Sequence, residues 1–532
     1  MAMNFIRRHD YPLVQTTSGT IRGYVQDDVF NFRGIPYGEA KRFMPPTPIK
    51  PWSGILDTQT YGPVSIPLFK HPIDKFDTAI GMRFWPASED CLNLNIWTNN
   101  INNETKKPVM FWIHGGGFAF GSSVELLAYE AENLVKKEDV VVVTVNHRLN
   151  IWGYLNLSAY GEEYKCSGTA GIADLVLALR WVKDNISRFG GDPSNVMIFG
   201  QSGGGMKVQA LMQVKDAEGL FHRAAIQSGC EYHNGSAVDL TPTVEESLKT
   251  ADLIVNELGL TKDTIQDIQT KSTAEIEQAV ERLVRKGHGE LLVRWGPIAN
   301  EYYPGTPLDA GLMDCSDSIP VIIGSNIGEW AETMGIDYGA ESSDETKMQL
   351  LQQQFGEHTD EMIAEFRKVY PDKDLIVLHY LDNIFRYPSL LYAQMRAAKA
   401  GTAPTYLYIL GYNFDFNGGF PAWHCSEIPL IFRSSLRMPI FHEEGAQKLQ
   451  EEMSSSWAQF ARTGDPNNPA IPEWHPYTVD EPATMVFDKN TAVRIGHDQK
   501  LTEMLHEYTI PGDIGEAIES IGVEKKAPAE FK

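Results

Sequence analysis

The chain of 532 residues has few cysteines, a deficit of basic residues and no long hydrophobic run. Its five cysteines are scattered and contain no C-x-x-C pair, which excludes a disulfide framework and a zinc-finger site. Lysine and arginine total 46 against 70 aspartates and glutamates, so the net charge of −24 repels nucleic-acid phosphates and anionic lipids. The densest apolar run, residues 140–145, is far shorter than the roughly 20 residues of a membrane-spanning helix. We therefore expect no nucleic-acid partner and no membrane anchor.

The first ten residues also lack the apolar core of a secretory signal, although they contain Arg7 and Arg8. Reduced thiols are the simplest interpretation of an odd number of scattered cysteines. We therefore expect a cytoplasmic protein, with secretion after removal of a leader left open. Hydrophobic residues make up 42% of the chain and charged residues 22%, which is the balance of a globular protein with a large core.

From residue 108 onward, short apolar runs alternate with amphipathic stretches. The expected strands are residues 109–113, 140–145, 196–199, 224–227, 321–324 and 405–410. The expected helices are residues 128–136, 171–188, 207–214, 344–370 and 382–398. This alternation predicts an α/β fold with a central, mostly parallel sheet covered by helices on both faces. Because no linker divides the chain, residues 1–532 are expected to form one domain, with helical insertions near 238–290 and 340–400.

The segment Gly200-Gln201-Ser202-Gly203-Gly204 fits the pattern G-x-S-x-G. In that pattern a serine stands on a tight turn between a strand and a helix, and the flanking glycines prevent clashes in the turn. Taken alone, the pattern is equally consistent with a flexible glycine loop. Its position after the strand 196–199 and before a helix favours a nucleophilic serine at Ser202.

A second glycine-rich segment, His114-Gly-Gly-Gly117, follows the strand 109–113. Consecutive glycines after a strand supply unobstructed backbone N–H donors for the oxyanion of an acyl-transfer reaction. A phosphate-binding loop is the weaker alternative, because the segment has neither the Lys-Ser/Thr ending nor the G-x-G-x-x-G spacing. We expect Gly116, Gly117 and Gly203 to supply the oxyanion donors.

Several longer segments resemble one family in the right order. Residues 189–204, FGGDPSNVMIFGQSGG, are similar to the serine signature of the type-B carboxylesterase/lipase (cholinesterase-like) family of α/β-hydrolases. Residues 89–97, EDCLNLNIW, resemble its second signature, and further matches extend the resemblance from about residue 18 to about 495. The resemblance implies an α/β-hydrolase fold with helical insertions over the active site. Because no cysteine precedes Cys91 and the turn 37–43 is short, the chain looks like a bacterial member.

The family uses a Ser–Glu–His triad, and the resemblance assigns its members in this chain. The segment 323–330, IGSNIGEW, resembles the family's acid segment and implies Glu329, while 419–427, GFPAWHCSE, resembles the histidine loop and implies His424 as the base. Gln201, Ser228 and Glu427 are expected to support the triad. Two positions depart from the family: Gln201 stands where glutamate is usual, and Gly203 where alanine is frequent.

The sequence therefore predicts a serine carboxylic-ester hydrolase that acts on small-molecule esters through an acyl-enzyme. An amidase or a lipase with the same triad is the main alternative, and a non-catalytic cholinesterase-like binding or adhesion protein is the third. No cofactor and no metal is implied, and the oligomeric state is left open. Because an ordinary imidazole titrates near pH 6.5, we expect turnover to rise between about pH 6 and 8. The resemblance also suggests two ion pairs, Arg42–Glu89 and Arg148–Asp174.

Overall fold

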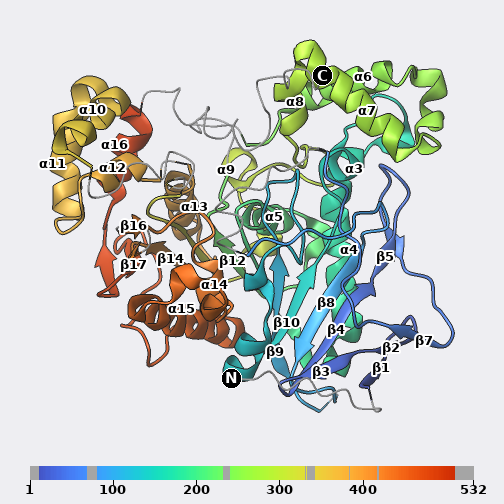
Figure 1. The fold of residues 1–532 in the computed structure, drawn as a ribbon, viewed down its shortest axis with the longest axis horizontal. Coiled ribbons are helices and arrows are strands. Elements are labelled where there is room, and N and C mark those ends of the chain that lie inside the picture. The colour runs from blue at the N-terminus through green and yellow to red at the C-terminus, as the bar shows by residue number, and fades with distance from the viewer. Residues whose placement is uncertain are drawn as a thin grey trace, which may run out of the picture.

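The computed structural model describes residues 11–68, 81–102, 104–231, 240–329, 331, 342–382, 384–415 and 419–509. Within these residues eleven strands form one sheet in the order β18-β17-β14-β13-β12-β11-β9-β10-β8-β4-β3 (Figure 1). The strands of this sheet are β3 (Tyr24–Gln26), β4 (Val29–Pro36), β8 (Asn93–Thr98), β9 (Lys107–Ile113), β10 (Val141–Val145), β11 (Gly191–Gln201), β12 (Arg223–Gln227), β13 (Val321–Asn326), β14 (Thr405–Leu410), β17 (Ala483–Phe487) and β18 (Ala492–Ile495). Neighbours from β10 to β17 pair parallel, whereas both edges pair antiparallel. The predicted α/β fold with a mostly parallel central sheet is confirmed.

Small sheets lie outside the main one: β1 (Leu13–Gln15) with β2 (Thr20–Arg22) and β7 (Ile55–Asp57), β5 (Gly38–Glu39) with β6 (Thr47–Pro48), and β15 (Asn413–Phe414) with β16 (Phe420–Pro421). The α-helices of the described residues are α2 (Glu132–Glu138), α3 (Asn150–Tyr154), α4 (Ala170–Asn185), α5 (Gly203–Leu211), α6 (Val244–Glu257), α7 (Thr273–Leu283), α8 (Gly289–Val293), α9 (Pro307–Ala310), α10 (Asp344–Phe355), α11 (Thr359–Val369), α12 (Ile376–Tyr380), α13 (Arg386–Ala398), α14 (Ile428–Ile431), α15 (Glu444–Thr463) and α16 (Gln499–Tyr508). None of them is both long and apolar enough to cross a bilayer.

The sheet separates two hydrophobic cores, because successive side chains of a strand point to opposite faces. In β9, Phe111 belongs to the core that includes buried residues of α4, α5 and α13. Its neighbour Trp112 belongs to the core that includes buried residues of α2, α14 and α15. The central strands are thus buried on both faces, which explains why they are continuous apolar runs in the sequence.

The two helix-rich stretches contain α6 to α8 and α10 to α13, respectively, and the first group lies apart from α10 to α12 in Figure 1. Residues 238–239 and 340–341, at the expected starts of these stretches, lie outside the described residues. Helix α13 contacts β13 and β14 and therefore packs directly on the sheet. The expected single helix 344–370 is divided, because Gly356 has a φ of 54° and ends α10.

Both predicted ion pairs are present. An Arg148 Nη2–Asp174 Oδ1 distance of 2.6 Å joins two buried side chains, and Arg42 Nη2 lies 2.5 Å from Glu89 Oε1. Arg148 also donates to the carbonyls of Lys41 and Met44. Because Arg42 lies between these two residues, both ion pairs hold the turn at residues 41–44 in place. All five cysteines lie in the described residues, and all are free thiols.

Candidate active site

Ser202 stands at the turn between β11 and α5. Its φ of 57° and ψ of −130° form a strained conformation that a non-glycine residue rarely adopts. The turn is fixed because the Ser202 N–H donates to the Gln227 carbonyl on β12 at 2.9 Å. Side chains on Gly200 and Gly204 would overlap backbone atoms packed against this turn, so the glycines of the motif are required by space. Ser202 is partly exposed, whereas every residue of α5 is buried.

The glycine loop after β9 packs directly on this turn. A Cβ added to Gly115 would lie 3.4 Å from the Ser202 Cβ, and one added to Gly203 would overlap backbone N, Cα and O of Gly117. Gly116 and Gly117 have φ values of 83° and 57°, which favour glycine. The structure thus brings together the three glycines that the sequence predicts as oxyanion donors.

Glu329 and His424 meet beyond the ends of neighbouring strands. Glu329 follows β13, and His424 lies between β16 and α14. The His424 Nδ1–Glu329 Oε2 distance is 2.5 Å, and the His424 N–H donates to the Glu329 carbonyl at 2.8 Å. A hydrogen bond at Nδ1 leaves Nε2 as the acceptor of the neutral ring.

The three residues predicted to support this pair surround it. Ser228 Oγ donates to Glu329 Oε1 at 2.6 Å. Gln201 Nε2 lies beside the imidazole, 3.2 Å from Nδ1 and 3.4 Å from Nε2 of His424. Glu427 is one step further away, because it accepts hydrogen bonds from Asn326 Nδ2 at 2.7 Å and Gln227 Nε2 at 3.3 Å.

A further carboxyl, that of Asp382, was missed by the sequence reasoning. Its Oδ1 accepts the N–H groups of Ile384 and Phe385, and the Phe385 ring stacks on His424 with centroids 5.4 Å apart. No motif marks Asp382. Its place near His424 depends on the packing of the segment before α13 beyond the end of β13, where the Asp382 N–H donates to the Ile327 carbonyl at 3.0 Å.

Burial controls the electrostatics of this carboxyl–imidazole cluster, which consists of Glu329, Glu427, Asp382 and His424. It raises the pKa of Glu329 and Glu427, against the hydrogen bonds that Ser228 and Asn326 donate. It raises the pKa of Asp382 to about 7, an effect that the Glu329 charge reinforces. It lowers the pKa of His424 to about 4, so the ring is neutral near pH 7.

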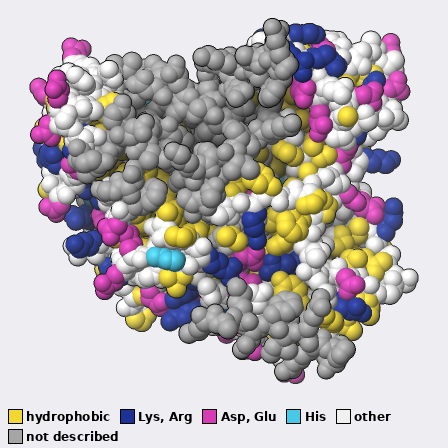
Figure 2. All heavy atoms as spheres, in the orientation of Figure 1, with side chains coloured by type: hydrophobic (Ala, Val, Ile, Leu, Met, Phe, Trp, Pro, Cys, Tyr) yellow, Lys and Arg dark blue, Asp and Glu magenta, His cyan; other side chains and the backbone are white. Residues whose placement is uncertain are grey.

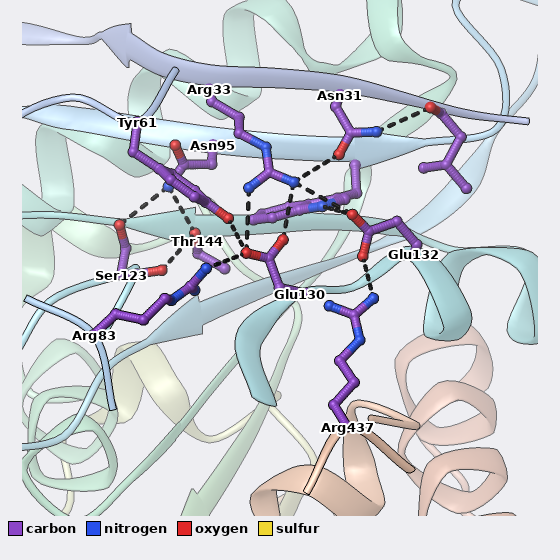
Figure 3. Close-up of polar contacts among 12 residues, drawn as sticks. Asn31, Arg33, Tyr61, Arg83, Asn95, Ser123, Glu130, Glu132, Thr144 and Arg437 are labelled. Atoms are coloured by element: carbon purple, nitrogen blue, oxygen red, sulfur yellow. Dashed lines mark hydrogen bonds and ion pairs between the residues drawn. The ribbon is translucent and has the colours of Figure 1, made fainter. Parts of the chain in front are cut away.

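A separate, largely buried network of ion pairs joins β4 to the start of α2 and to the segment after α14 (Figure 3). Arg33 of β4 lies 2.9 Å from Glu130 and 3.3 Å from Glu132. Arg83 lies 2.6 Å from Glu130, and Arg437, in the segment that follows α14, lies 2.9 Å from Glu132. We call these five residues the Arg33 network.

Among the described residues, no group of three or more histidines, cysteines and acidic residues is placed to hold a metal ion. The mixed sheet, the strained serine turn and the carboxyl–imidazole pair beyond the strand ends define an α/β-hydrolase. A model of the Carboxylesterase family matches residues 10–505, and the chain belongs to this family. It is a carboxylic-ester hydrolase, as its relatives are.

Three similar proteins illustrate the relationship. Para-nitrobenzyl esterase of Bacillus subtilis (strain 168) is 30% identical over 500 residues, which cover 91% of this chain and 96% of that protein. Phenmedipham hydrolase of Pseudarthrobacter oxydans is 29% identical, over 89% of this chain and 94% of that protein. The solved structure of an esterase from anaerobic Clostridium hathewayi, which can hydrolyze aliphatic aromatic polyesters, has a TM-score of 0.87 at 40% identity and covers 95% of this chain and 100% of that chain.

Proposed function

We propose that the protein hydrolyses carboxylic esters through an acyl-enzyme on Ser202, with His424 as general base and Glu329 as the acid that orients it. The observation that carries the proposal is the 2.5 Å Glu329–His424 contact beside the strained Ser202 turn. Glu329 fixes the tautomer that leaves Nε2 free to accept a proton, and its charge stabilises the imidazolium that forms.

In the first half of the reaction, Ser202 Oγ bonds to the ester carbonyl carbon while His424 Nε2 takes the hydroxyl proton. The carbonyl oxygen becomes an oxyanion, which the N–H groups of Gly116, Gly117 and Gly203 stabilise. The carbon–oxygen bond to the alcohol then breaks, and His424 returns the proton to the leaving alcohol. In the second half, a water activated by His424 releases the acid and restores Ser202.

The supporting residues have distinct tasks in this scheme. Ser228 holds one Glu329 oxygen so that the other faces the imidazole. Glu427 anchors Asn326, whose amide also donates to the Trp423 carbonyl next to His424. Gln201 places a neutral amide beside the imidazole ring. Position 201 therefore lacks the negative charge that would attract an ester with a cationic alcohol group, and we propose neutral esters as substrates.

A polyester substrate is the second candidate, and a specific observation favours it. The Clostridium hathewayi esterase that acts on aliphatic aromatic polyesters is 40% identical over nearly the whole chain. In this chain Phe84, Trp85 and Phe120 are 38–56% exposed, and Phe120 packs on Gly116 of the glycine loop. Hydrophobic side chains also gather near the middle of the face seen in Figure 2. The exposed Phe120 ring beside the glycine loop suits a polymer with aromatic units.

We also propose that α6 to α8 and α10 to α12 are insertions into a single hydrolase domain. The five free thiols support a reducing compartment, and we propose the cytoplasm.

The test of the mechanism compares Ser202→Ala with Ser228→Ala. We expect Ser202→Ala to abolish turnover of p-nitrophenyl esters, leaving only the roughly 10³–10⁴-fold acceleration over water that remains without a nucleophile. An organophosphate should label the wild type once, and mass spectrometry of the labelled peptide should find the adduct on Ser202. An adduct on Ser228 would refute the assignment. Matched p-nitroanilides and a polyester film, assayed beside the esters, separate the amidase and polyesterase alternatives.

A further inference from the structure

A group of buried polar side chains packs against the glycine loop on the side of α5. Lys207 of α5 is fully buried, as are His114 and His147, whose rings lie 4.8 Å apart. Glu125 and Tyr129 complete the group, with 3.2 Å between Tyr129 Oη and Glu125 Oε1. None of these side chains has a task in the mechanism above.

The helix places Lys207 under the oxyanion donors. Gly203 and Lys207 are four residues apart on α5 and therefore share one face of the helix. A helical side chain leans toward the N-terminus, so that of Lys207 extends back toward Gly203. Its Nζ donates to the carbonyl of His114, the first residue of the glycine loop, at 3.2 Å, and lies 5.4 Å from the centre of the Phe118 ring.

This ammonium is buried without a close counter-charge. Within the described parts of the chain no carboxylate oxygen lies within 4.0 Å of Lys207 Nζ, and the group that accepts its hydrogen bond is a neutral carbonyl. The N-terminus of α5 adds a partial positive charge at the same place. Two positive contributions that converge in a buried site are unfavourable in the resting enzyme, and they become favourable when an anion forms there.

We propose that Lys207 is a positioning residue for ester hydrolysis, whose ammonium holds the glycine loop from beneath and stabilises, through that loop, the oxyanion of the transition state. The inference rests on the proposed acyl-enzyme mechanism at Ser202. It assigns the residue five positions after the nucleophile a function in the reaction.

The protonation of Lys207 provides a readout that a purely structural role would not affect. Burial lowers the pKa of Lys207 to about 7, against the opposing charge of Glu125. The other groups that face it are His114 and His147, whose pKa values burial lowers well below the usual range, and Tyr129, whose pKa burial raises well above it. Burial also raises the pKa of Glu125 to about 7, and we expect Lys207 to lose its positive charge between pH 6 and pH 9.

The experiment measures kcat of the wild type and of Lys207→Met for a p-nitrophenyl ester, per active site titrated with an organophosphate. We expect the wild-type kcat to exceed that of the variant at least tenfold at pH 6 and less than threefold at pH 9, with KM changed less than twofold. At pH 6 the affinity for an aryl trifluoromethyl ketone, which forms an oxyanion on the serine, should fall by the same factor as kcat. A ratio below twofold at pH 6, or one that is equal at both pH values, overturns the proposal.

Two controls keep the result decisive. If the organophosphate does not label one site per wild-type chain at Ser202, the proposed function fails, whatever Lys207→Met does. If Lys207→Met does not fold, Glu125→Gln replaces it: loss of the opposing carboxylate should lower the pKa of Lys207 and move the alkaline fall in kcat to lower pH. An alkaline limb that does not move overturns the proposal.

Discussion

The Arg33 network and the carboxyl–imidazole cluster are both buried and polar, but they differ in how their charges are matched. In the network, three arginines face two glutamates, and Tyr61 donates a further hydrogen bond to Glu130 (Figure 3). Although burial opposes it, the charges of Arg33 and Arg83 lower the pKa of Glu130. In the cluster, three carboxyls surround one imidazole, and burial raises the pKa of each carboxyl.

The difference separates stability from function. Matched buried charges hold segments together and remain ionised at neutral pH, whereas unmatched ones shift their pKa values and mark sites where protons move. We therefore expect changes in the cluster to reduce turnover with little effect on stability, and changes in the network to do the opposite.

The largest effect should come from Glu329→Gln. The amide keeps the size of the carboxyl but loses the charge that fixes the imidazole tautomer, so kcat should fall about 10³–10⁴-fold. Thermal unfolding should change little, because the amide oxygen can still accept the hydrogen bonds that Ser228 Oγ and the Asn326 N–H donate to Glu329 Oε1. A fall in kcat below tenfold would show that Glu427 or Asp382 can orient His424 instead, and Glu427→Gln is the matched control.

The second effect is the converse, produced by Glu130→Gln. The change removes one of the two carboxylates that face Arg33, which keeps Glu132 at 3.3 Å, and the carboxylate that the partly exposed Arg83 contacts. The unfolding free energy in a denaturant titration should therefore fall by about 3 kcal/mol. The kcat per titrated site should stay within twofold. The pKa of Glu130 is lower in the folded than in the unfolded state. Its contribution to the free energy of unfolding is therefore complete above the unfolded-state pKa of about 4.3, and it is lost as the pH falls from that value through the folded-state pKa. The variant and the wild type should therefore converge in stability in acid.

A third, smaller effect tests a contact that involves no charge. Gly203→Ala would drive a methyl group into the Gly117 backbone, displacing an oxyanion donor, and should lower kcat about 10–100-fold. Gly259→Ala is the control, since a methyl group added at Gly259 has nothing within 4 Å. Equal kcat values for both variants would mean that the glycine loop moves aside without loss.

The smallest effect is a displacement of the pH profile. A proton on His424 removes the base, and burial lowers its pKa to about 4, so the acid limb of kcat/KM should lie below pH 6.5. An imidazole with its ordinary pKa would instead place the limb between about pH 6 and 8, as expected from the sequence, so the measurement distinguishes the two. Variants of the Arg33 network that fold should show the acid limb of kcat/KM at the same pH as the wild type. A limb at pH 6.5 or above would show that His424 is more solvated than its burial implies.

Much of the site could be predicted from the sequence because its geometry restricts the residues allowed. The Ser202 turn requires glycines on both sides, and apolar runs identified the central strands. The acid and the base, by contrast, came from resemblance alone, since no local pattern distinguishes Glu329 among 70 acidic residues.

What the sequence could not predict depends on contacts between distant segments. Lys207 has the pattern of an ordinary helical lysine, and only the position of the glycine loop makes it buried. Asp382 and the Arg33 network are equally invisible, because hydrophobic periodicity predicts the face of an element and not its neighbours. The division of the helix 344–370 depends on the conformation of a single residue, Gly356.

The order of the strands in the sheet has a consequence for biosynthesis. During translation Ser202 and the glycine loop emerge more than 200 residues before His424, which depends on β14 and the elements after it. A nascent chain therefore holds its nucleophile long before it can be activated, and long-range parallel pairing is slow to form. Ester turnover by ribosome-bound chains of increasing length should begin abruptly, once the last parallel strand β17 has joined the sheet. The chain length at which turnover begins would therefore report the completion of folding.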